Sequence, residues 1–158
     1  MKKTKEKMLT LLGLAKGNLQ RDGRLRPVFL LENRMKGCEM ILPDLSDDIK
    51  KQISFQIIKK QLESGAFISF TFITESWVKT TDKDEPNLKK LLKGEIKPRD
   101  CMDRKEAITI YYKDEEGTGF VLNNLFTRKE KEIIFEESYF LENTENTHIE
   151  GNIWNIWK

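Results

Sequence analysis

Residues 67–78 read FISFTFITESWV, and this stretch decides the fold that the sequence predicts. Phenylalanine, isoleucine and threonine, which are enriched in β-strands, make up most of it. The stretch is long, and its first part is apolar on both alternating faces, which is typical of a strand covered on both sides. We therefore predict a central strand from Phe67 to Val78.

An amphipathic helix and a β-hairpin are predicted upstream of this strand. Apolar residues recur at helical spacing from Met8 to Leu19, and Gly23 is placed to end the helix. The uninterrupted apolar run within Leu25 to Glu32 is typical of a buried strand. A short loop that contains glycine follows, so Cys38 to Leu42 is expected to return as the second arm of a hairpin.

A second helix is predicted directly before the central strand. Asp44 or Ser46 is expected to cap its start, and Gly65 is expected to end it. We expect this helix to pack on the sheet through an apolar stripe. The stripe comprises Ile49, Ile53, Ile57, Ile58 and Leu62.

Three further strands are predicted after the central one, at Ala107 to Lys113, Phe120 to Phe126 and Ile133 to Phe140. Between the central strand and these three lies a long polar stretch with two prolines, residues 80–104. A polar segment of this length is typical of a loop or functional flap. Residues 141–158 form a C-terminal tail.

The 158 residues therefore predict one α+β domain. Its sheet is mostly antiparallel, with about five to six strands and two main helices, in the order α-β-β-α-β-(long loop)-β-β-β. This element order resembles the roadblock, longin and profilin-like folds. A fold of this kind does not determine a function, so the resemblance implies no activity.

Composition argues against several classes of protein. The 28 basic and 26 acidic residues nearly cancel, whereas a dedicated nucleic-acid-binding domain is usually strongly basic. Cys38 and Cys101 are far apart and form no CxxC pair, so no zinc or redox motif is present. Since neither a convincing export signal nor a membrane-length apolar run occurs, we predict a cytoplasmic protein with no membrane contact and no cofactor.

Standard catalytic motifs are missing from the sequence. The one histidine, His148, lies in the polar tail, and no nucleophile-elbow motif accompanies it. The glycines form neither GxGxxG nor GxxxxGK[ST], which excludes the usual nucleotide-binding loops. The leading prediction is therefore a non-catalytic module that binds proteins or associates with itself.

The end of the central strand is the best candidate for a pocket, because polar and aromatic side chains there adjoin the long loop. The candidate residues are Glu75, Ser76, Trp77, Asp100, Asp103 and Arg104. One alternative function is a metal-dependent hydrolase or nuclease that uses Glu75, Asp100 and Asp103. The simpler interpretation is that Glu75 marks the strand's emergence into water, while Trp77 covers the rim of the sheet.

The tail carries four large apolar residues, namely Ile153, Trp154, Ile156 and Trp157. Because their exposure to water is unfavourable, the tail is expected either to fold back on the domain or to contact a partner. A homodimer or another protein, bound through the sheet edge or this tail, would suit the second case. A weak nucleic-acid binder remains an alternative, based on Lys50, Lys51, Lys59, Lys60, Lys89, Lys90 and Lys93.

Three short runs resemble a set of uncharacterised bacterial proteins. They are residues 20–29 (QRDGRLRPVF), 74–78 (TESWV) and 103–107 (DRKEA), and the likeness extends over residues 8 to about 127. This resemblance implies no activity. The sequence therefore predicts a fold and a place to look for function, without a reaction.

Overall fold

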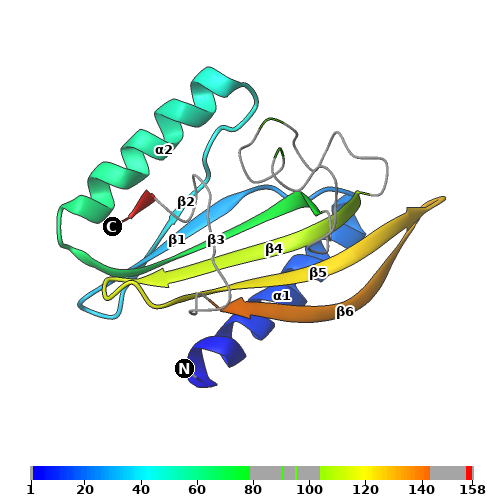
Figure 1. Cartoon of the computed structure of the whole chain (residues 1–158), viewed down its shortest axis with the longest axis horizontal. Helices are drawn as coiled ribbons and strands as arrows, with labels where there is room; N and C mark the ends of the chain where they lie inside the picture. Colours follow the sequence, from blue (N-terminus) through cyan, green and yellow to red (C-terminus); the bar gives the residue numbers. More distant parts are fainter. Residues whose placement is uncertain (1, 79–89, 91–94, 96–103, 143–155, 158) are drawn as a thin grey trace.

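The stretch predicted as the central strand is strand β3, Phe67–Val78, which lies between β1 and β4 in the sheet. A computed structural model describes residues 2–78, 90, 95, 104–142, 156 and 157. Two helices and six strands occur in this part of the chain, in the order α1-β1-β2-α2-β3-β4-β5-β6 (Figure 1). The other elements are α1 (Lys2–Asp22), β1 (Val28–Asn33), β2 (Cys38–Ile41), α2 (Asp48–Glu63), β4 (Lys105–Asp114), β5 (Gly119–Lys129) and β6 (Glu132–Glu142).

The sheet has the order β2-β1-β3-β4-β5-β6, and each neighbouring pair of strands is antiparallel. The predicted α+β class with a mostly antiparallel sheet is therefore confirmed. α2 forms the connection from the edge strand β2 to the central strand β3, which pairs on the other side of β1. Of the predicted loop, residues 80–104, the described residues include only Lys90, Glu95 and Arg104.

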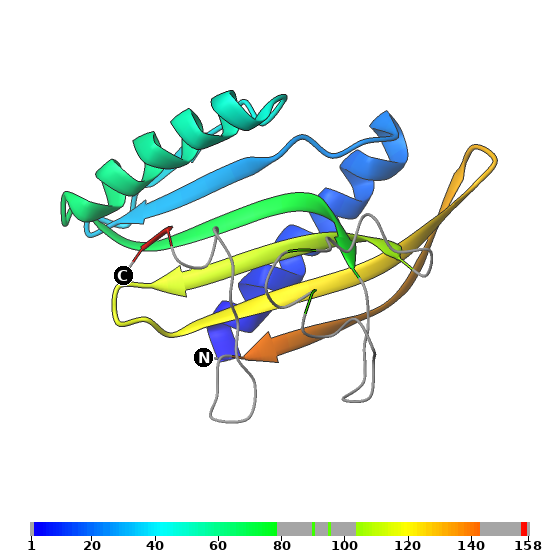
Figure 2. The same ribbon diagram turned by 45° about the horizontal axis from the view of Figure 1, so that its top comes forward.

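Helices cover the sheet on opposite faces. Figure 1 shows α1 crossing behind the strands, and Figures 1 and 2 both show α2 along the β2–β1 edge. On the α1 face, Ile73 of β3 joins a core cluster with Leu12 and Leu19 of α1. The α2 face holds a second cluster, in which the Phe29 and Phe72 rings stack with centroids 4.2 Å apart. Residues of β3 alternate between these two cores, as side chains of a strand do.

α1 follows the predicted amphipathic pattern. Met8, Leu12, Ala15 and Leu19 are its buried residues, and they recur every three or four positions. At its end, Gly23 has a φ of 75°, and its backbone N–H donates to the Leu19 carbonyl at 2.8 Å. Neither α1 nor α2 combines the length and apolar character that a membrane span requires.

The cap of α2 lies one residue after Ser46 and three residues after Asp44, the two predicted caps. Asp47 is the N-cap, and its carboxylate accepts a hydrogen bond from the Lys50 backbone N–H at 2.8 Å. Asp44 was expected to serve here, but its carboxylate accepts hydrogen bonds from the backbone and hydroxyl of Ser46 instead. These bonds hold the pKa of Asp44 below its ordinary value. The helix ends before Gly65, whose φ of 79° favours glycine.

The apolar stripe of α2 divides into two sides. Ile58 and Leu62 are buried against the sheet, whereas Ile49, Ile53 and Ile57 are exposed. Successive residues of a helix are rotated by about 100°, so positions 49, 53 and 57 share one side and positions 58 and 62 lie on another. The three isoleucines are therefore not part of the core that the sequence pattern suggested.

Replacing the N-cap residue, Asp47→Ala, should lower the free energy of unfolding by about 1 kcal/mol, because the first turn of α2 loses a backbone partner. Urea denaturation followed by circular dichroism measures this change. Asp48→Ala is the matched control, since Asp48 is exposed and does not cap the helix. An equal loss from both substitutions would contradict the capping role.

Candidate functional site

Glu75 lies at the end of β3, on the α1 face of the sheet. Its register partner on β4 is Ile108, which belongs to the α1 core. One carboxylate oxygen, Oε1, accepts a hydrogen bond from the Leu25 backbone N–H at 2.5 Å. The other, Oε2, accepts one from Nη2 of Arg128 at 3.4 Å. Both oxygens of Glu75 are therefore engaged within the chain.

Arg128 of β5 ties several elements together. Its Nε donates to both carboxylate oxygens of Glu106, at 3.2 and 3.1 Å, and its Nη1 donates to the Gly23 carbonyl at 2.5 Å. A cation at this place is favourable, because the carbonyl end of α1 carries partial negative charge. The guanidinium thus links the end of α1 to β3 and β4. Together with Glu75, these groups form what we call the Arg128 junction, comprising Gly23, Glu75, Glu106 and Arg128.

Sequence reasoning missed the Arg128 junction. The predicted strand ends at Phe126, whereas β5 continues through Arg128 to Lys129. The partners of Arg128 are distant in sequence, because Glu75 and Glu106 precede it by 53 and 22 positions. Only the sheet register brings them together. A signal was nevertheless present, because a carboxylate within the apolar β3 stretch requires a partner when it is partly buried.

Trp77 shares the α1 face with Glu75, two residues further along β3. Its side chain is 40% exposed. The guanidinium carbon of Arg104 lies 4.4 Å from the centre of the indole ring, which is a cation–π contact. Of the predicted pocket residues, Glu75, Trp77 and Arg104 are thus gathered at the same end of the sheet.

Ser76 points to the opposite face and begins a row of polar side chains across four strands. Its hydroxyl is hydrogen-bonded to the hydroxyl of Thr109 on β4. The Thr109 hydroxyl donates to Asn123 Oδ1 at 2.8 Å, and Asn123 Nδ2 donates to the Tyr139 hydroxyl at 3.5 Å. Thr109 and Asn123 are buried. The row consists of hydroxyl and amide groups, so it offers hydrogen bonds and no general base for the Ser76 hydroxyl.

The predicted metal site is only partly visible. Asp100 and Asp103 lie outside the described residues, as do Cys101 and His148. Within the described ranges, no group of three or more histidine, cysteine, aspartate or glutamate side chains is placed to hold a metal ion. To bind a metal ion, Glu75 would have to lose its hydrogen bonds from Leu25 and Arg128. The metal-dependent interpretation therefore remains a prediction for Asp100 and Asp103.

The described part of the tail lies against the α2 face of the sheet. Ile156 and Trp157 are buried, and the Trp157 and Phe70 ring centroids are 6.3 Å apart. The Trp157 carbonyl accepts a hydrogen bond from Nζ of Lys113 at 2.7 Å, and burial lowers the pKa of that lysine. These two residues thus fold back onto the chain's own core. Ile153 and Trp154 lie outside the described residues.

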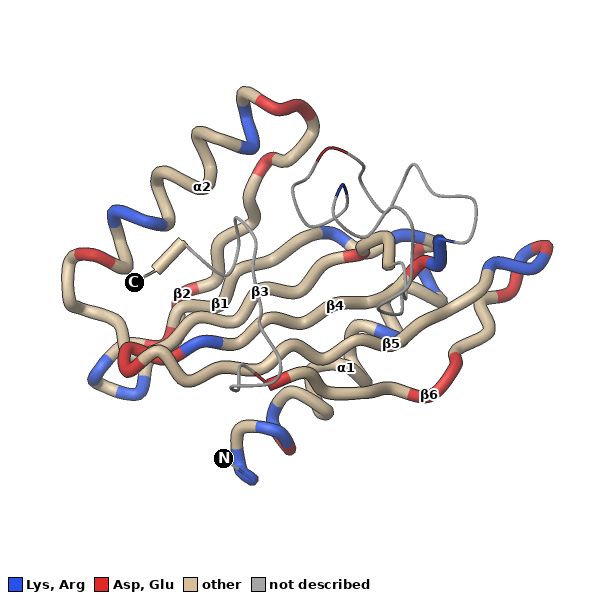
Figure 3. Tube along the Cα trace, viewed as in Figure 1, with Lys and Arg blue, Asp and Glu red and all other residues tan. Residues whose placement is uncertain are grey.

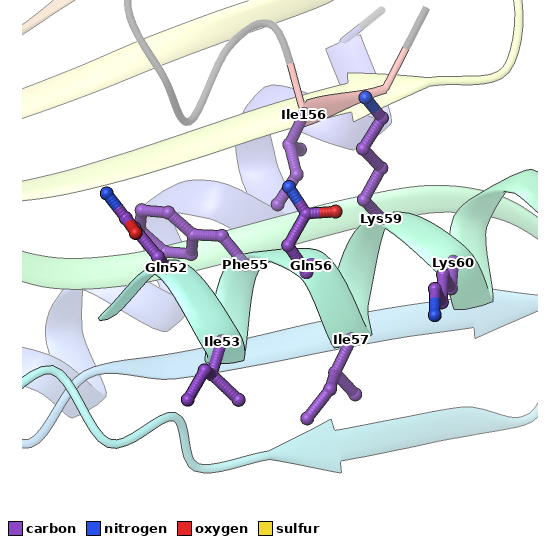
Figure 4. A pocket seen from close by; sticks show the side chains of 8 residues that line it. All are labelled: Gln52, Ile53, Phe55, Gln56, Ile57, Lys59, Lys60 and Ile156. Atoms are coloured by element: carbon purple, nitrogen blue, oxygen red, sulfur yellow. The ribbon is translucent and has the colours of Figure 1, made fainter. Parts of the chain in front are cut away.

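The exposed isoleucines of α2 form a surface that we call the outer flank, comprising Ile49, Ile53 and Ile57. Their side chains are 71%, 55% and 51% exposed. Figure 4 shows Ile53 and Ile57 pointing to the β2 side of α2, while Gln52, Gln56 and Lys59 point to the other side. A hollow of about 730 Å³ runs beside the helix and reaches Ile156. Clusters of large exposed apolar side chains often mark interaction sites.

The comparisons give no family assignment. The chain matches no protein-family model, no curated protein and no solved structure.

Removing the central cation, Arg128→Ala, should lower the free energy of unfolding by about 2 kcal/mol, because Glu75 and Glu106 lose a charged hydrogen-bond partner. Denaturant titration measures the loss. Lys129→Ala, at the next and exposed position, is the control and should change stability by less than about 0.5 kcal/mol. Similar losses from the two variants would show that the Arg128 junction contributes nothing specific.

Trp157→Ala should destabilise the protein by about 3 kcal/mol, because a large buried ring leaves a cavity. Trp77→Ala is the matched control. It should cost clearly less, since Trp77 keeps 40% of its surface in water whereas Trp157 keeps 8%. Thermal and urea unfolding of the two variants compare the losses, and a larger loss for Trp77 would contradict the packing of the tail.

Proposed function

We propose that this chain is a non-catalytic, cytoplasmic protein-interaction module that binds a protein partner on the outer flank of α2. The observation that carries the proposal is the exposure of Ile49, Ile53 and Ile57 on one side of one helix. A buried isoleucine side chain is more stable than an exposed one by about 1.5–3 kcal/mol. A partner that covers the outer flank would recover this free energy.

The spacing of these isoleucines supports a docking role. Positions 49, 53 and 57 are each four residues apart, so the side chains form a continuous ridge along α2. The chain's own sheet does not use this ridge, because Ile58 and Leu62 on the other side of the helix fill the core. An apolar helix ridge is a common element of protein recognition.

The polar groups near the end of β3 support a non-catalytic role. Both oxygens of Glu75 accept hydrogen bonds within the chain, and the Ser76 hydroxyl lies on the other face. A hydroxyl needs an adjacent base to become a nucleophile, and neither Thr109 nor Asn123 supplies one. The cytoplasmic placement is supported by Cys38, an exposed and free thiol that suits a reducing compartment.

Photo-crosslinking tests the proposal in living cells that express the protein. Position 56 is seven residues from Ile49 and therefore borders the outer flank, although Figure 4 shows the Gln56 side chain turned away from β2. A benzophenone amino acid at position 56 is compared with the same group at position 20, on exposed α1, as the control. We expect protein adducts from position 56 that disappear when Ile53→Asp is added. Ile53 is exposed, so this substitution leaves the fold intact, which circular dichroism verifies. Adducts at neither position, or adducts that Ile53→Asp does not reduce, would overturn the proposal.

A further inference from the structure

We infer that the partner of the outer flank is a second copy of this chain, and that two α2 helices pack antiparallel across a two-fold axis at Ile53. The inference rests on the proposed function, since it names the occupant of the same surface. Most assemblies of identical chains are closed by such an axis, which requires that one surface be complementary to itself. α2 meets this requirement in the spacing of the outer-flank isoleucines and in the charges at its two ends.

The apolar residues of the outer flank are symmetric about Ile53. Ile49 and Ile57 each lie four residues from it, on the same side of the helix. In an antiparallel pair centred on Ile53, each Ile49 therefore lies opposite Ile57 of the other copy. The two Ile53 side chains meet at the axis. All six isoleucines then leave water together, and no apolar residue of the ridge faces a polar one.

The charges of α2 are arranged in the same sense. Its start carries three acids, Asp44, Asp47 and Asp48, beside two lysines, and its end carries Lys59 and Lys60 beside one acid. Figure 3 shows both signs of charge at each end of α2. An antiparallel pair places the basic end of each helix beside the acidic start of the other. A parallel pair would place like charges together, which is unfavourable.

The remaining charges of α2 are compatible with this arrangement. Lys50 forms an ion pair with Asp44 at 3.7 Å, and the Lys51 ammonium lies 5.8 Å from the Phe55 ring centre. With these two lysines counted against its three acids, the start of α2 has a net charge of −1, and the end, with Lys59, Lys60 and Glu63, has a net charge of +1. Glu63 is the one acid at the basic end of the helix. Lys60 is seven residues from Ile53, which places it on the same side as the isoleucine ridge.

The exposed apolar residues of α1 provide a useful contrast. Leu9 and Leu14 are exposed there. The first half of α1 carries Lys2, Lys3, Lys5 and Lys7 against the single acid Glu6, and Lys16 follows. Lys5 and Lys7 form ion pairs with Glu142 and Glu32, and the Lys16 ammonium lies 5.1 Å from the Phe135 ring centre. Neither end of α1 carries a net negative charge, so α1 lacks the opposite charges that α2 has at its two ends.

The dimer is expected to be weak. α2 has 16 residues and is therefore about 24 Å long. A contact between two such helices buries less surface than the roughly 800 Å² per partner of a standard stable interface. We expect a dissociation constant in the micromolar range, so that dimers form and separate with changes in concentration.

Sedimentation velocity over about 1–500 µM purified full-length protein tests the inference. The chain should shift from monomer to dimer across this range. Ile53→Asp should raise the dissociation constant at least about tenfold, because two carboxylates would meet at the axis. Leu14→Asp, an equal change on exposed α1, should leave it unchanged. A wild-type chain that stays monomeric at the highest concentration overturns the inference, as does a dimer that Ile53→Asp does not weaken.

Two charge variants test the antiparallel orientation. Lys60→Glu and Ser46→Lys should each weaken their own dimers about threefold or more, because positions 60 and 46 lie seven residues on either side of Ile53 and face each other across the axis. An equimolar mixture should restore association, since the introduced Glu and Lys then face each other in the mixed dimer. A mixture that associates no better than either variant alone overturns the antiparallel arrangement.

Crosslinking and sedimentation together separate binding to a second copy from binding to another protein. If the purified chain is monomeric but position 56 still forms adducts that depend on Ile53, the second-copy inference is wrong and the interaction module stands. If the adducts have the mass of two copies, both are supported. If position 56 forms no adducts and the chain is monomeric, both are wrong.

Discussion

The structure depends on β3 being covered on both faces and paired on both edges. Such a strand determines where the neighbouring strands and helices pack, because each of its side chains enters one of two cores and each backbone group pairs with a neighbouring strand. Phe70 and Phe72 determine where α2 and the tail pack, and Ile73 does the same for α1. Ser69, a buried polar residue of β3, donates a hydrogen bond to the carboxylate of Glu32 on β1.

Much of this fold could be predicted from the sequence, because strand alternation and helix spacing are local patterns. The limits of β3 agree with the prediction, since the apolar run begins at Ala66 and Phe67 and the polar stretch begins after Val78. The predicted cap of α2 was wrong because four acidic or hydroxyl residues lie within the five positions 44–48. Only the actual turn geometry selects Asp47.

The site was less predictable than the fold. Glu75, Ser76 and Trp77 are consecutive, and strand alternation already separates Ser76 from the other two. What alternation does not reveal is the partner of each group, since the register of β3, β4 and β5 decides that Arg128 meets Glu75. The isoleucines of α2 present the opposite difficulty. Their pattern predicted burial, and only the position of the helix along the β2–β1 edge shows which side faces outward.

The burial of Trp157 also bears on the order in which the two cores are completed. Ribosomes make a chain from its N-terminus, and partly finished domains expose apolar surface. All described residues of the α1 core lie between Met8 and Phe140, so this layer can close before the tail exists. The α2 core needs Ile156 and Trp157, which are synthesised later. During translation, Phe70 therefore stays partly uncovered until Trp157 has been made. The α2 face of the sheet is thus where a nascent-chain chaperone would find exposed aromatic surface.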